Sequence, residues 1–65
     1  MTGLITESEW KGLTLNEAIQ KASGKGMTHR IVEEDGRSLM IDADAKSNRV
    51  NLRLRGGIVI GAFPG

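Results

Sequence analysis

The stretch NRVNLRLRGGIVIGAF, residues 48–63, constrains the fold of this chain more than any other part of the sequence. From Val50 to Leu54 apolar residues alternate with polar ones, so a strand formed here has one apolar and one polar face. Gly56-Gly57 follows, and both central positions of a type I′ turn need the positive φ that glycine adopts without strain. Residues 58–60 are all β-branched and begin a return strand. The stretch therefore predicts an antiparallel β-hairpin.

A helix is predicted over residues 15–23, within the stretch GLTLNEAIQKASGKG. Thr14 can cap the first free amides while Glu17 reaches back to the cap residue, an arrangement called a capping box. Gly24 offers a left-handed position that would end the helix. One apolar stripe is formed by Leu15, Ala18, Ile19 and Ala22. A helix this short needs a surface to pack on.

Length and composition limit the chain to one small domain. With 65 residues it can bury only about 60% of the surface that its unfolded form exposes, so the core is small. The chain contains no cysteine, so disulfides and thiolate metal sites are excluded. A hydrophobic fraction of 38% argues against disorder. The net charge of +1 gives no global attraction to nucleic acid or to an anionic membrane.

The sequence shows neither a membrane-spanning run nor the pattern of a signal peptide. No apolar run reaches the length of about 18 residues that a membrane span needs. The start, MTGLITESEW, lacks the basic and apolar parts of a signal peptide, so a cytoplasmic location is expected. Residues 1–8 carry no clear pattern and are expected to form a flexible N-terminal tail, with residues 9–65 as the domain.

Residues 27–34, MTHRIVEE, favour a further strand because Thr28, Ile31 and Val32 are β-branched. The order helix, strand, long loop, hairpin indicates an α+β domain with one helix packed on a short mixed β-sheet. A long crossing connection favours parallel pairing of the strands on either side of it. This connection, residues 35–48, exceeds about 12 residues, and loops of that length are usually functional or disordered. We therefore predict that the exposed loop is the functional surface.

The residue types of common active sites point away from an enzyme. His29 is alone in a predicted strand, with no cysteine to activate. Carboxylates occur in pairs at Glu33-Glu34 and at Asp42 and Asp44, but acid–base catalysis needs such groups in different environments, and a small flat domain offers little pocket. The segment after Asp42 lacks the glycine and the bidentate glutamate of a calcium loop. Neither a metal nor another cofactor is therefore predicted.

A nucleic-acid-binding accessory protein is a weaker hypothesis. It rests on Arg49, Arg53 and Arg55, which alternate along a predicted strand and could contact phosphates. Binding of single strands needs aromatic platforms on which bases stack. The chain has only Trp10 and Phe63 as aromatics, and we expect both in or beside the core. We therefore predict neither a nucleic-acid partner nor a membrane partner.

The order of several short features resembles a known family. These features are Glu9-Trp10, Gly12, a capped helix with Glu17-Ala18, Ile31-Val32, a glycine-led loop, the RVN of residues 49–51 and a final Gly65. In order and spacing, residues 9–65 resemble the potato inhibitor I family of serine protease inhibitors, of the eglin and barley chymotrypsin inhibitor type, with its microbial elastase-inhibitor-like relatives. The resemblance implies a wedge-shaped α+β domain whose exposed loop enters a protease cleft as a substrate-like strand.

The resemblance also assigns roles to individual residues. The protease-binding loop would consist of Leu39, Met40, Ile41, Asp42, Ala43, Asp44, Ala45 and Lys46. Ala43 would fill the specificity pocket, before a scissile bond to Asp44; under a second alignment of the loop, Ile41 takes that role. A small specificity residue suits a subtilisin- or elastase-type protease. Arg49 and Asn51 would support the loop from the following strand.

A second hypothesis keeps the scaffold and drops the inhibition. Asp42 would place a second negative charge before the proposed scissile bond, and many protease clefts would desolvate that charge at a cost. The alternative is therefore a non-inhibitory protein-binding module, or a self-associating one, on the same α+β domain.

Overall fold

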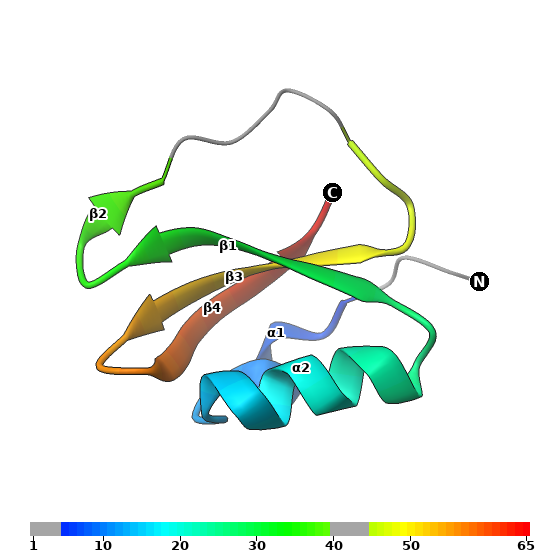
Figure 1. Cartoon of the computed structure of the whole chain (residues 1–65), viewed down its shortest axis with the longest axis horizontal. Coiled ribbons are helices and arrows are strands. Elements are labelled where there is room, and N and C mark those ends of the chain that lie inside the picture. The colour runs from blue at the N-terminus through cyan, green and yellow to red at the C-terminus, as the bar shows by residue number, and fades with distance from the viewer. Residues whose placement is uncertain (1–4, 40–44) are drawn as a thin grey trace.

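One long helix packs on a four-stranded mixed sheet in the computed structural model, which describes residues 5–39 and 45–65 (Figure 1). The elements are α1 (Glu7–Trp10), α2 (Leu15–Gly24), β1 (Thr28–Glu34), β2 (Arg37–Ser38), β3 (Arg49–Arg55) and β4 (Ile58–Pro64). The strand order is β2-β1-β3-β4, in which β1 and β3 are parallel and the other two pairs are antiparallel. The predicted α+β class and the parallel pairing across the long connection are confirmed.

Helix α2 begins at a capping box, as the sequence predicts. Thr14 Oγ1 accepts a hydrogen bond from the Glu17 amide at 3.2 Å, and Glu17 Oε1 accepts one from the Thr14 amide at 2.9 Å. Both bonds satisfy amides near the helix start, where no carbonyl of the preceding turn is present to accept them. The start of the helix at Leu15 therefore agrees with the prediction.

The end of α2 differs from the prediction. Gly24 is still helical, and the residue with a left-handed backbone is Gly26, whose φ is 69°. The Met27 amide donates to the Ala22 oxygen at 2.8 Å, and the Gly26 amide donates to the Ser23 oxygen at 3.0 Å. These two bonds make a Schellman motif. The prediction that Gly24 takes the left-handed position is wrong, because either of two nearby glycines can take it and Gly26 does.

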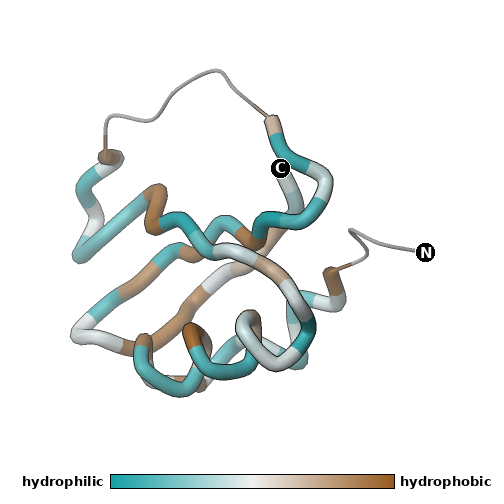
Figure 2. Tube along the Cα trace, turned by 45° about the vertical axis from the view of Figure 1, so that its right-hand side comes forward, coloured by the Kyte–Doolittle hydropathy of each residue, from teal (hydrophilic) through white to brown (hydrophobic). Residues whose placement is uncertain are grey.

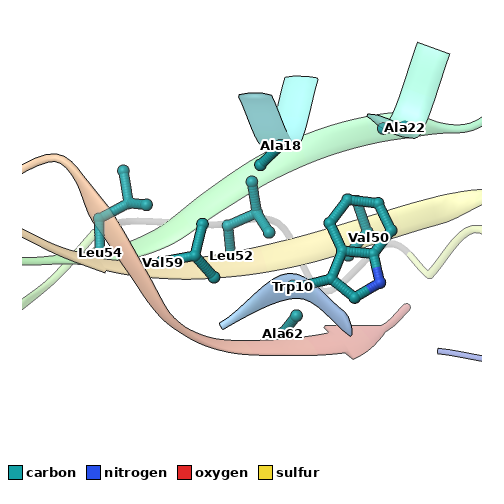
Figure 3. Close-up of a cluster of buried hydrophobic side chains, with 8 residues drawn as sticks. All are labelled: Trp10, Ala18, Ala22, Val50, Leu52, Leu54, Val59 and Ala62. Carbon is teal, nitrogen blue, oxygen red and sulfur yellow. The ribbon is translucent and has the colours of Figure 1, made fainter. Parts of the chain in front are cut away.

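The hydrophobic core lies between α2 and one face of the sheet (Figure 3). Its buried members are Trp10, Ala18, Ala22, Val50, Leu52, Leu54, Val59 and Ala62. The two alanines are small, so α2 can approach the strands closely. Trp10 is 1% exposed, and the Lys21 Nζ atom lies 5.5 Å from the centre of its ring. The prediction that Trp10 belongs to the core is confirmed.

Two tight turns are joined by a hydrogen bond at one end of the sheet. Gly56-Gly57 connects β3 to β4 with φ values of 58° and 77°, which confirms the predicted hairpin. Asp35 and Gly36, with φ values of 51° and 82°, connect β1 to β2. Asp35 Oδ1 accepts a hydrogen bond from the Gly56 amide at 2.7 Å. Residues 35–38, predicted as the start of the long loop, thus form a hairpin that was missed because β2 has only 2 residues.

The ordered domain begins before residue 9, the predicted boundary. Ile5 packs against the core, and α1 begins at Glu7. Glu7 Oε2 accepts a hydrogen bond from the Ala62 amide in β4 at 3.2 Å. The prediction of a tail over residues 1–8 is therefore wrong for residues 5–8. The contacts that hold this segment come from the far end of the chain, so no local pattern announces them.

Candidate functional site

The sheet face opposite α2 carries two buried polar side chains of β3. Val50, Leu52 and Leu54 belong to the core, so the residues between them face the other way. Arg49 is only 8% exposed, and Asn51 is fully buried. The resemblance to the potato inhibitor I family gives these two residues an expected supporting role. Buried polar side chains need hydrogen-bond partners, so their partners define what this face holds together.

Arg49 joins the end of β4 to the segment that enters β3. Its Nε donates to the backbone oxygen of Gly65 at 3.0 Å, and the Lys46 amide donates to the same oxygen at 3.2 Å. The Gly65 amide donates to the Arg49 backbone oxygen at 3.3 Å. Figures 1 and 2 both show the C-terminal end of β4 beside residues 45–48. We call Arg49, Lys46 and Gly65 together the Gly65 node.

Asn51 connects three strands through one amide group. Its Oδ1 accepts a hydrogen bond from Arg30 Nε in β1 at 2.8 Å, and its Nδ2 donates to the Phe63 backbone oxygen in β4 at 3.4 Å. The sheet register places these residues side by side, because Asn51 pairs with Arg30 on one side and with Phe63 on the other. Within residues 5–39 and 45–65, no buried side-chain nitrogen or oxygen lacks a partner. We call the sheet face with Arg30, Arg49, Asn51 and Phe63 the polar face; its buried side-chain nitrogens and oxygens all have hydrogen-bond partners.

The predicted protease-binding loop is held at both of its described ends. At the first end, the Leu39 amide donates to the Val32 oxygen of β1 at 3.0 Å. At the second end, Ala45 and Lys46 are exposed, and the Lys46 amide donates to the Gly65 oxygen. Residues 40–44 lie outside the described residues, and with them the proposed scissile pair Ala43-Asp44. The candidate site is therefore defined by its two anchors and the polar face.

Residues 40–44 also include Met40, Ile41 and Asp42. The structure therefore locates the scissile bond under neither alignment of the loop. The roles assigned to these residues by the resemblance stay predictions. The described neighbours nonetheless fix the direction of the connection. Because β1 and β3 are parallel, the chain leaves the sheet near the end of one strand and must return to the opposite end before it enters the other.

The three arginines of β3 have different environments and do not form one phosphate-facing row. Arg49 is buried in the Gly65 node. Arg53 Nε forms an ion pair with Glu33 Oε1 at 3.2 Å, across the parallel pair of strands. Arg55 is exposed near the turn. The hypothesis of a nucleic-acid-binding protein needed all three on one accessible face, and this arrangement does not support it.

Phe63 and Arg30 are the two residues of this face for which the sequence was least informative. Phe63 was expected in or beside the core, but it is 43% exposed, because its pairing with Asn51 places it on the polar face. Arg30 was not singled out at all. A polar residue in a short strand carries no signal of its role until the register of β1 against β3 is known.

Comparison with known proteins identifies no relative of the chain. No family model, no curated protein and no solved structure matches the chain. In the part of the chain that the structure describes, no helix has both the length and the apolar character to cross a bilayer. Among the same residues, no three histidine, cysteine or acidic side chains gather as a metal site would require.

Proposed function

We propose that the protein inhibits a serine endopeptidase by presenting residues 39–46 to the protease cleft as a substrate-like strand. The proposal rests mainly on one observation: both described ends of this segment are fixed to the sheet, at Leu39 by the Val32 oxygen and at Lys46 by the Gly65 node. The sequence resemblance to the potato inhibitor I family supports the same function. It also supplies the expected target class, a subtilisin- or elastase-type enzyme.

The physical basis of such inhibition is preorganisation. Ordering the backbone of one residue costs about 1–2 kcal/mol of conformational entropy, so a free peptide of this length would lose much of its binding energy on docking. A segment whose ends are already bonded to the sheet has lost part of that entropy during folding. Main-chain hydrogen bonds of an extended strand to the enzyme then supply affinity, and one side chain supplies specificity.

The anchors also bear on the fate of the loop after cleavage. If the protease cuts between Leu39 and Lys46, the first fragment end stays bonded to β1 and the second stays bonded to the Gly65 node. Both halves of a cut loop would therefore stay attached to the folded domain, so cleavage alone would not separate them from it. In this proposal Ala43 is the specificity residue, with Ile41 as the alternative, and Arg49 and Asn51 act as supports.

The first test is a titration of subtilisin, elastase and chymotrypsin with the purified protein. The expected result is stoichiometric inhibition of at least one enzyme, which Ala43→Pro abolishes because proline removes a main-chain donor and fixes φ. Lys25→Ala, which changes an exposed residue after α2, is the matched control and should inhibit like the natural protein. Replacing Ala43 or Ile41 by leucine, one at a time, identifies the specificity residue by which change redirects inhibition towards chymotrypsin.

The opposite outcome is also informative. Rapid cleavage between Leu39 and Lys46 by all three enzymes, with no slowing of their activity on a peptide substrate, would refute the proposal. It would favour the non-inhibitory protein-binding or self-associating module. Sedimentation of the protein at increasing concentration would then separate self-association from binding to another protein.

A further inference from the structure

Arg30 is the least expected member of the polar face. It lies in β1, next to Asn51 in the sheet register, and its Nε donates to Asn51 Oδ1 at 2.8 Å in a partly buried setting. A hydrogen bond from a charged donor is roughly twice as strong as a neutral one. The bond therefore has enough strength to determine how the Asn51 side chain is turned.

The orientation of that amide has a consequence on the other side of β3. An arginine side chain has five N–H donors and no acceptor, so it can face only the oxygen of the amide and not its NH₂ group. With Oδ1 turned towards Arg30, Nδ2 is turned towards β4, where it reaches the Phe63 oxygen at 3.4 Å. Arg30 thus selects the one amide orientation that lets Asn51 bond to β4.

The Phe63 oxygen lies two residues before Gly65, the centre of the Gly65 node. Gly65 has a φ of 129°, a backbone conformation that residues with a side chain rarely adopt, and a Cβ added there would lie 3.4 Å from Asn51 Nδ2. The backbone oxygen of Gly65 binds both Arg49 and the Lys46 amide. A shift of β4 at Phe63 would therefore be passed to the second anchor of the loop.

We propose that Arg30 is a positioning residue for the loop: it orients the Asn51 amide, Asn51 holds the end of β4, and β4 fixes Lys46 through Gly65. Its importance for inhibition rests on the proposed function, whereas its effect on the Lys46 anchor does not. Lysine cannot replace it, because an ammonium group is a point charge without the planar fork that places Nε against Oδ1.

Amide hydrogen exchange tests the anchor without any protease. Arg30→Met keeps the aliphatic stem and removes the donors, and Arg55→Met is the matched control on the exposed end of β3. In Arg30→Met we expect the Lys46 and Gly65 amides to exchange about tenfold faster relative to the Val59 amide, which is bonded to Leu13 on the far edge of β4. Arg55→Met should leave this ratio unchanged.

Four results decide the proposal. Equal acceleration of Lys46 and Val59 would mean that Arg30 only stabilises the whole domain, and no acceleration would mean that it positions nothing; either result overturns the proposal. Arg30→Lys should behave like Arg30→Met, and it supplies the same readout if the methionine variant does not fold. In an Asn51→Ala background, Arg30→Met should change the Lys46 ratio less than it does in the natural protein, because the connecting amide is gone; an undiminished effect would overturn the proposal.

A protease assay then separates this proposal from the proposed function. If the natural protein inhibits, Arg30→Met should be cleaved in the loop about tenfold faster while its specificity among the three enzymes stays the same. If the natural protein inhibits none of them, the proposed function fails, and the exchange ratios still decide the role of Arg30.

Discussion

Replacing Arg49 by methionine removes one charged hydrogen-bond donor from the Gly65 node and leaves most of the side-chain volume in place. Arg49 is 8% exposed, so little water can replace its Nε bond to the Gly65 oxygen at 3.0 Å. A hydrogen bond to a charged group contributes about 1.5–3 kcal/mol to stability. The Gly65 oxygen would keep the Lys46 amide as a partner, so this acceptor stays satisfied. We therefore expect the free energy of unfolding to fall by about 2 kcal/mol.

For a chain of 65 residues this is a large effect, since small domains are stable by only about 0.05–0.15 kcal/mol per residue. A loss of about 2 kcal/mol would lower the melting temperature by roughly 8–16 °C. The single tryptophan, Trp10, is buried in the core, so its fluorescence during urea and thermal unfolding reports the transition. Arg55→Met, an exposed change on the same strand, should stay within about 0.5 kcal/mol of the natural protein. If the two variants are equally stable, the reasoning about the Gly65 node is wrong.

Three further predictions concern the scaffold. Gly24→Ala should raise the free energy of unfolding by about 0.5–1 kcal/mol, because Gly24 is helical and a Cβ there meets nothing within 4 Å. Gly26→Ala should lower the free energy of unfolding by about 1–2 kcal/mol, because Gly26 has a positive φ. Urea unfolding measures both changes. Glu7→Ala should remove the acceptor of the Ala62 amide in the edge strand β4, so that this edge can pair with a strand of a second copy. We expect sedimentation that depends on concentration, and a strictly monomeric variant would contradict this. Thr14→Ala should cost about 1 kcal/mol through loss of the capping box, and an unchanged urea midpoint would contradict that.

The features that the sequence predicts correctly are those whose cause lies within a few neighbouring residues. The capping box needs only Thr14 and Glu17, and the β3–β4 turn needs only Gly56-Gly57. The missed features depend on residues that are far apart in the chain. Glu7 is held by Ala62, and Arg30 is aligned with Asn51 only through the parallel register of β1 and β3.

The candidate site shows the same division. Arg49 and Asn51 lie on the polar side of a clearly predicted strand, and the resemblance to the potato inhibitor I family is what gives them an expected supporting role. Their partners do not stand out, since the position of Gly65 beside Lys46 is set by the return path of β4 and by the parallel pairing of β3. The strand pattern therefore predicts that these residues lie on the polar face of the sheet, and only the sheet register identifies which groups each one binds.

The two faces of the sheet differ in what they contribute. The face under α2 buries the apolar side chains, and burial of apolar area supplies most of the free energy of folding. The opposite face buries Asn51, whose hydrogen bonds to Arg30 and to Phe63 replace those that its amide makes to water in the unfolded chain. An apolar side chain of similar size could be as stable in that place, but it would have no preferred orientation towards Arg30 or Phe63. A buried amide is therefore better explained by the geometry it imposes on β1 and β4, and so on the loop anchored between them, than by stability.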